Sequence, residues 1–230
     1  MAENKHTSYD LAQMQSLPLS VKVEMTKRRI QEWYEHWEGQ VYVSFSGGKD
    51  STVLKHIVDS MYDDVPSVFV DTGLEYPEVR KFVLDVRGGQ YPELRSNVEI
   101  LHPKMRFDEV IQTYGYPAIS KEVAMKIYYA QRGSKQALKA MRGEDKNGNP
   151  SAFRKRFIKY AYLIDSGIPI SAHCCTMMKK APVHVFEKET KRKLIIGTLA
   201  EESYLRTQKW MKNGCNAFES NRPISQPLAF

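Results

Sequence analysis

The sequence predicts an α/β protein with an open, mainly parallel sheet, helices on both faces and a basic helical insertion. Three observations predict this class. Short β-rich runs alternate with segments of helical periodicity, and the 42% apolar content of 230 residues is enough for a buried core. A basic, mainly helical segment interrupts the alternation at about 106–163. Because strands that alternate with helices pair in parallel through right-handed crossovers, an open sheet is expected.

The predicted elements follow one another along the chain. Residues 21–37 place apolar side chains among charges at helical spacing and predict an amphipathic helix. A β-rich run at 41–45 is followed by a glycine-containing turn and a second helix. Further strands are predicted at 67–70 and 98–101, with a helix between them that Pro77 opens. The last strand, at 193–197, leads into a helix that begins near Ala200.

We expect one domain over residues 1–230, with an N-terminal helical segment at 1–40 and the basic insertion at 106–163. The apolar end at 227–230 leaves open that the C-terminal part is truncated. No uncharged apolar run approaches the roughly 20 residues of a membrane span, and the N-terminus lacks the apolar core of a secretory signal. A cytoplasmic location and no membrane partner are therefore expected.

The basic segment favours anionic partners. The chain has 34 basic and 27 acidic residues, a formal net charge of +7. Eleven Lys or Arg residues lie between 121 and 159 against three acidic ones, and Tyr and Phe residues interleave with them. Such a segment is either a solvated helical surface or a contact for nucleic acid, tRNA or DNA, through residues 121–160.

The segment Ser-Gly-Gly-Lys-Asp-Ser at 46–51 lies where the first strand turns into a helix. Its two glycines let several amides converge on one anion at the positive end of the helix, and Lys49 supplies a counter-charge. A Walker loop is excluded because Asp50 follows Gly-Lys, and no G-x-G-x-x-G occurs. The alternative is an ordinary strand-to-helix turn. The candidate phosphate-binding residues are Ser44, Ser46, Gly47, Gly48, Lys49, Asp50 and Ser51.

This segment resembles the PP-loop of ATP pyrophosphatases and of the phosphoadenosine phosphosulfate (PAPS) reductase family. Residues 69–78 are similar to that family's second-strand segment, and His173-Cys174-Cys175 with the later Lys179, Lys180 and Pro182 resembles its paired-cysteine segment. Residues 197–206 are similar to its G-x-R-x-x-x-S-x-x-R stretch, with Leu199 in place of the first Arg. The resemblance covers residues from about 41 to 230.

The resemblance implies roles for residues outside the loop. Asp71, Thr72 and Gly73 would border the adenosine, although an Asx turn is the alternative for Asp71. Arg206 would face the distal phosphate or sulfate, with help from Ser203 and Gly197, because a planar guanidinium forms two parallel hydrogen bonds to such groups. The predicted catalytic residues are Lys49, Asp50, Arg206 and Cys175.

The three cysteines leave two interpretations open. Cys174, Cys175 and Cys215 are candidate ligands of a [4Fe–4S] cluster, or they are two small thiols and one unrelated thiol. The reductases of the family also act through a cysteine in a Glu-Cys-Gly context near their C-terminus, and no cysteine follows Cys215 in this sequence.

Three functions remain open. The first is a sulfonucleotide reductase-like enzyme that binds adenylyl sulfate (APS) or PAPS and works with a reductant or sulfur-donor protein. The second is an ATP-dependent enzyme, with Mg²⁺ as a candidate cofactor, that adenylates or thiolates nucleic acid. The third is a nucleotide-binding module without catalysis.

Overall fold

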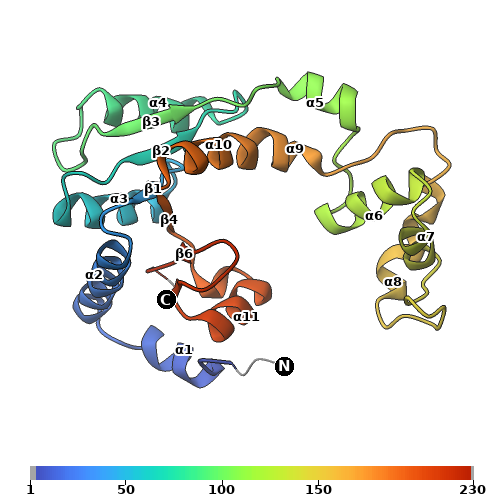
Figure 1. Ribbon diagram of the computed structural model, residues 1–230, viewed down its shortest axis with the longest axis horizontal. Coiled ribbons are helices and arrows are strands. Elements are labelled where there is room, and N and C mark those ends of the chain that lie inside the picture. The colour runs from blue at the N-terminus through green and yellow to red at the C-terminus, as the bar shows by residue number, and fades with distance from the viewer. Residues whose placement is uncertain (1–3, 229–230) are drawn as a thin grey trace. The chain divides into compact units, whose positions relative to one another are not determined.

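The predicted α/β sheet is present in the computed structural model, which describes residues 4–228 (Figure 1). Its strand order is β3-β2-β1-β4-β6-β5, and all neighbours are parallel except the pair β5 and β6. The ends of the predicted domain, 1–3 and 229–230, lie outside the described residues. The strands are β1 (Val41–Ser44), β2 (Ser67–Val70), β3 (Val98–Leu101), β4 (Lys193–Ile196), β5 (Asn216–Ala217) and β6 (Ile224–Ser225).

Three helices cover one face of the sheet: α2 (Leu19–His36), α3 (Lys49–Met61) and α4 (Pro77–Arg87). Ile30 and Trp33 of α2 pack with Leu54 of α3 and with Val43 of β1 in one buried cluster. A second cluster joins α4 to Phe45, Phe69 and Val98. The central strands consist mostly of apolar residues, as expected for a parallel sheet whose strands are covered by helices.

The opposite face of the sheet is covered by α10 (Ala181–Thr190). Successive side chains of a strand point to opposite faces, so Tyr42 points away from Val41 and Val43. Its ring lies edge-on to Phe186 of α10, with centroids 5.1 Å apart, and its hydroxyl donates to Glu187 Oε1 at 2.8 Å. The prediction of helices on both faces is thus confirmed.

The chain divides into two compact units. The sheet unit contains residues 1–101 and 185–230, and the helical unit contains 102–184, which includes the predicted insertion at 106–163. Ile127, Met141, Phe157 and Ile170 are buried in the core of the helical unit. Its helices are α5 (Phe107–Tyr114), α6 (Lys121–Gln131), α7 (Lys135–Met141), α8 (Arg154–Phe157), a 3₁₀ helix (Ile158–Leu163), α9 (His173–Cys175) and a π-helical turn (Thr176–Lys180).

Three parts of the sheet unit differ from the prediction. The short strands β5 and β6 follow the strand that is predicted to be the last. A short helix, α1 (Ser8–Gln15), precedes the predicted N-terminal one and begins at a Thr7 capping box. The helix predicted from Ala200 is a 3₁₀ turn at Ala200–Glu202 followed by α11 (Tyr204–Asn213), because the side chain of Ser203 caps a new helix. None of the helices within residues 4–228 is long and apolar enough to cross a membrane.

A buried ion pair within α3 lies next to the residue that precedes β3. Lys55 is 0% exposed, and its Nζ contacts Asp59 Oδ2 at 2.9 Å and Asn97 Oδ1 at 2.8 Å. Burial lowers the pKa of Lys55, whereas Asp59 opposes that shift. Since desolvation of the ammonium is costly, the lysine depends on its carboxylate partner.

We therefore predict that Asp59→Ala lowers the free energy of unfolding by about 3–5 kcal/mol, because it leaves a buried ammonium without its counter-charge. The measurement is urea unfolding followed by tryptophan fluorescence. The matched control is Glu24→Ala, which removes an exposed partner of Lys27 and should cost less than about 1 kcal/mol.

The loss should shrink as the pH rises. A lysine whose pKa is lower in the folded than in the unfolded state gives stability that increases with pH between those two values. Raising the pH toward about 10 should therefore recover part of the stability of Asp59→Ala. A loss no larger than that of the control would contradict the role of the ion pair.

Candidate functional site

The candidate site lies where the strand order reverses. The chain moves from β1 through α3 to β2 on one side, and it returns through α10 to β4 on the other side of β1. Ser44 is paired with Ile196, so both strands end at the same edge. Ligands of open α/β sheets bind at such a switch point. A pocket of about 370 Å³ is lined there by Ser44, Ser46, Gly48, Lys49, Asp50, Ser51, Ile196, Gly197, Thr198, Glu202 and Arg206.

The loop after β1 is held by its own hydroxyl groups. The Ser46 amide donates to Ser51 Oγ at 3.1 Å, and Ser51 Oγ donates to the Gly48 carbonyl at 2.9 Å. Gly47 has φ of +74°, and a Cβ there would lie 2.9 Å from side-chain atoms of Val79 and Val83. Gly47 therefore shapes the loop against α4 and does not line the pocket, whereas Gly48 does.

The N-terminus of α3 opens into the pocket. Gly48 is the N-cap and supplies no side-chain acceptor, so the first amides of the helix are available to a ligand. The positive end of the helix dipole adds to their attraction for an anion. Lys49 is 81% exposed, and its Nζ contacts Asp50 Oδ1 at 2.6 Å. The predicted counter-charge is thus at the pocket, but it is paired with its neighbour.

Gly197 joins β4 to the first turn of α3. A Cβ at Gly197 would lie 2.8 Å from the Asp50 carbonyl oxygen and 3.3 Å from the Ser51 amide nitrogen. Both are backbone atoms, which cannot move aside as a flexible side chain can. Only glycine therefore allows this approach of strand and helix, which fixes two walls of the pocket.

Arg206 reaches the pocket from α11. Ser203 caps α11 by accepting a hydrogen bond from the Arg206 amide, and it is not among the pocket-lining residues. The Arg206 guanidinium forms an ion pair with Glu202, one turn earlier. The pocket therefore contains two cations and two carboxylates, each cation beside one carboxylate.

The predicted adenosine-binding residues lie at the end of β2 and do not line this pocket. Asp71 is buried, accepts from the Gly73 amide at 3.1 Å and forms an ion pair with Arg80 at 2.8 Å. Thr72 donates its hydroxyl to Glu75 at 2.7 Å. The Asx-turn alternative thus describes the local geometry of Asp71, and an adenosine contact stays a prediction.

The cysteines are divided between the two units. Cys174 and Cys175 line a second pocket, of about 210 Å³, within the helical unit, and Lys121 Nζ lies 3.9 Å from Cys175 Sγ. Cys215 belongs to the sheet unit, where its sulfur accepts from Trp210 Nε1 at 3.2 Å and burial raises the pKa of its thiol.

The structure adds no support for the predicted iron–sulfur ligand set. Within residues 4–228, no group of three or more His, Cys, Asp or Glu side chains is placed to hold a metal ion. A cluster shared by Cys174, Cys175 and Cys215 therefore stays a prediction, and Cys175 remains a catalytic candidate by resemblance alone.

Sequence reasoning missed three pocket residues: Ile196, Thr198 and Glu202. Thr198 carries a usable signal, because a polar residue directly after a strand and a glycine often meets a ligand in this class of sheet. Glu202 carries none in the strand pattern. Its place depends on the 3₁₀ turn that precedes α11.

Comparison with known proteins places most of the chain in one domain type. Residues 40–226 match the phosphoadenosine phosphosulfate reductase domain. Over 82 residues the chain is 28% identical to an adenosine 5'-phosphosulfate reductase of Bacillus cereus, covering 36% of this chain and 34% of that protein.

Two uncharacterized proteins of Methanocaldococcus jannaschii are also similar. One is 38% identical over 91 residues, 39% of this chain and 18% of that protein. The other is 40% identical over 57 residues, 24% of this chain and 14% of that protein. The chain thus aligns with about a third or less of each relative's length.

The contact at Gly197 gives a testable consequence. Gly197→Ala should lower the free energy of unfolding by about 1–3 kcal/mol, because its methyl group would overlap the Asp50 carbonyl. Gly88→Ala is the matched control, since a Cβ there would meet atoms no closer than 3.4 Å. Equal thermal unfolding midpoints for the two variants would show that the walls of the pocket do not depend on this approach.

Proposed function

Because the chain belongs to the phosphoadenosine phosphosulfate reductase family, we propose that the pocket between β1 and β4 binds an adenine nucleotide with a terminal sulfate, such as APS or PAPS, for sulfur chemistry. The observation that carries the proposal is the convergence of the α3 N-terminus, Lys49 and Arg206 on one pocket at the switch point. Such a site presents amides and two cations to a ligand with two anionic groups.

In this proposal the α3 N-terminus holds the phosphate next to the ribose. Free first-turn amides and the helix dipole bind a phosphate without side-chain specificity, and Lys49 adds a charge-assisted hydrogen bond. The ligand replaces Asp50 as the partner of Lys49. If a Mg²⁺ ion accompanies the nucleotide, Asp50 is one carboxylate that would hold it together with the phosphates.

Arg206 then takes the terminal group. A guanidinium offers paired donors that match two oxygens of a sulfate or phosphate. The backbone of Arg206 is fixed in the first turn of α11. Reduction of the sulfate to sulfite needs two electrons. Two thiols of a reductant would supply them and become a disulfide, while the S–O bond to the nucleotide breaks and the nucleotide leaves with its phosphate.

The proposal is tested by calorimetric titration of the protein with APS, PAPS and ATP, and by sulfite release from the bound sulfonucleotide with dithiothreitol as reductant. We expect APS or PAPS to bind more tightly than ATP. Binding of ATP alone, without either sulfonucleotide, would overturn the proposal. Binding of a sulfonucleotide without sulfite release would indicate a nucleotide-binding module and not a reductase.

A second candidate is an ATP-dependent enzyme that adenylates its substrate and releases pyrophosphate. The observation that favours it is Leu199, which occupies the position of the first Arg in the family pattern. Residues 197–206 therefore contribute one cation to the pocket, Arg206. Pyrophosphate release from ATP that increases when tRNA or DNA is added would support it. Turnover of APS without any turnover of ATP would count against it.

Lys49→Ala should weaken nucleotide binding by about 1.5–3 kcal/mol, the contribution of a hydrogen bond to a charged group. The measurement is calorimetry with whichever nucleotide binds the unchanged protein. Lys212→Ala, at an exposed residue in the last turn of α11, is the control and should bind as the unchanged protein does. Equal affinities for both variants would contradict the phosphate role of Lys49.

Glu202→Gln should strengthen nucleotide binding several-fold, because it frees the Arg206 guanidinium and removes a negative charge from the pocket. The gain should shrink as salt is added, since the pair is partly exposed and screened. The control is Glu201→Gln, an exposed neighbour that does not line the pocket. A weaker binding by Glu202→Gln would show that the carboxylate itself contacts the ligand.

A further inference from the structure

The helical unit carries the whole positive surplus of the chain. Residues 102–184 contain fifteen Lys and Arg against six Asp and Glu, a net charge of +9. The sheet unit contains nineteen Lys and Arg against twenty-one Asp and Glu, a net charge of −2. A net charge of this size favours anionic partners, and it belongs to a different unit from the pocket between β1 and β4.

Within this unit, most side chains of α8 and several of the 3₁₀ helix that follows it are exposed. Phe157 is buried and anchors the segment in the core. Phe153 is 60% exposed and Tyr162 is 70% exposed, at opposite ends of the segment. The basic–aromatic surface consists of Phe153, Arg154, Lys155, Arg156, Ile158, Lys159 and Tyr162, all exposed.

Most cations of this surface have no acidic partner. Arg156 pairs with Glu122 at 2.7 Å and lies near the Phe153 ring, 5.3 Å from its centroid. Within residues 4–228, Arg154, Lys155 and Lys159 form no ion pair.

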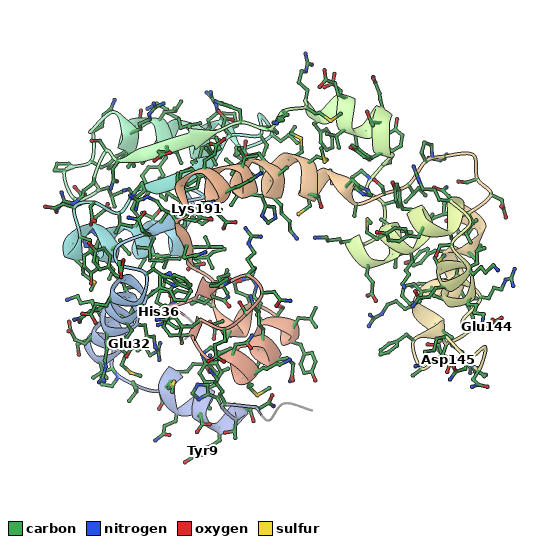
Figure 2. The ribbon with its side chains drawn as sticks, viewed as in Figure 1. Tyr9, Glu32, His36, Glu144, Asp145 and Lys191 are labelled. Carbon is green, nitrogen blue, oxygen red and sulfur yellow. The ribbon has the colours of Figure 1, made fainter. Side chains whose placement is uncertain are left out.

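The nearby loop does not neutralise them. Gly143 lies against Arg154, and the loop that follows it carries two acids, Glu144 and Asp145 (Figure 2). Asp145 accepts hydrogen bonds from the amides of Asn147 and Asn149. Its carboxylate is therefore used within its own loop.

We propose that the basic–aromatic surface binds single-stranded nucleic acid. Unpaired cations neutralise successive phosphates, and exposed aromatic rings stack on bases, which are accessible only where a strand is unpaired. The apolar side chains stand singly among cations and do not form the continuous apolar face that an interfacial membrane helix needs. DNA and RNA share this chemistry, and the experiment separates them.

The first test uses fluorescence anisotropy with a labelled 20-nucleotide single strand, as DNA and as RNA, over a series of salt concentrations. Neutralising Arg154, Lys155 and Lys159 together to Gln should lower the slope of log affinity against log salt by about two, since each phosphate contact on a single strand contributes about 0.7. The control neutralises Lys5, Lys188 and Lys212, exposed lysines of the sheet unit, and removes the same charge.

The second test addresses stacking. Phe153→Ala combined with Tyr162→Ala should weaken single-strand binding roughly 5- to 100-fold, the range expected for loss of base stacking. The control is Tyr9→Ala with Tyr204→Ala, which removes two equally exposed rings from the sheet unit (Figure 2 labels Tyr9). Circular dichroism checks that each variant is folded.

Three results would overturn the proposal: no binding at about 100 mM salt, equal binding by the two Gln triples, or equal binding by the two aromatic pairs. Equal affinity for a duplex of the same sequence, or for vesicles of anionic lipid, would also overturn it. Lys49→Ala should bind the single strand as the unchanged protein does, so failure of this proposal and failure of the nucleotide proposal are distinguishable.

Discussion

The backbone contact between Gly197 and the first turn of α3 is the constraint on which the candidate site depends. It brings the end of β4 against the start of α3 with no side chain between them. The sheet topology places these two segments side by side, and the missing Cβ lets them meet. Everything else in the pocket is positioned from this contact: the loop amides lie on one wall, and α11, which follows β4, carries Arg206 to the other.

The electrostatics of the pocket follow from pairs that are local in sequence. Lys49 lies beside Asp50, and Arg206 lies one helical turn after Glu202. Each cation is thus neutralised by a neighbouring carboxylate, and under the proposed function an anionic ligand would exchange places with that carboxylate. Such an exchange would lower the net gain from each charge, because the phosphate or sulfate would replace an existing carboxylate. It also favours ligands with two anionic groups, since they can release both carboxylates at once.

The two units separate two kinds of chemistry. The sheet unit holds the switch-point pocket and has a small negative charge, whereas the helical unit holds Cys174, Cys175 and the positive surplus. Cys215, half-buried beside Trp210, is part of the sheet unit. The net charge of +7 thus comes from the helical unit, as the cluster of basic residues at 121–159 predicts.

The sequence by itself determined the fold class, most strands and the glycine-containing loop between β1 and α3. These depend on local signals: β2 and β3 are short apolar runs, and Pro77 marks the start of α4. It also predicted the residues of the loop, because glycines, a lysine and serines at a strand end form a local pattern. Only the tertiary structure decided that Glu202 and Thr198 line the pocket and that the Asp71 carboxylate forms an ion pair with Arg80. These contacts depend on how the segments fold against one another. The periodicity of one segment carries no information about which residues it will contact.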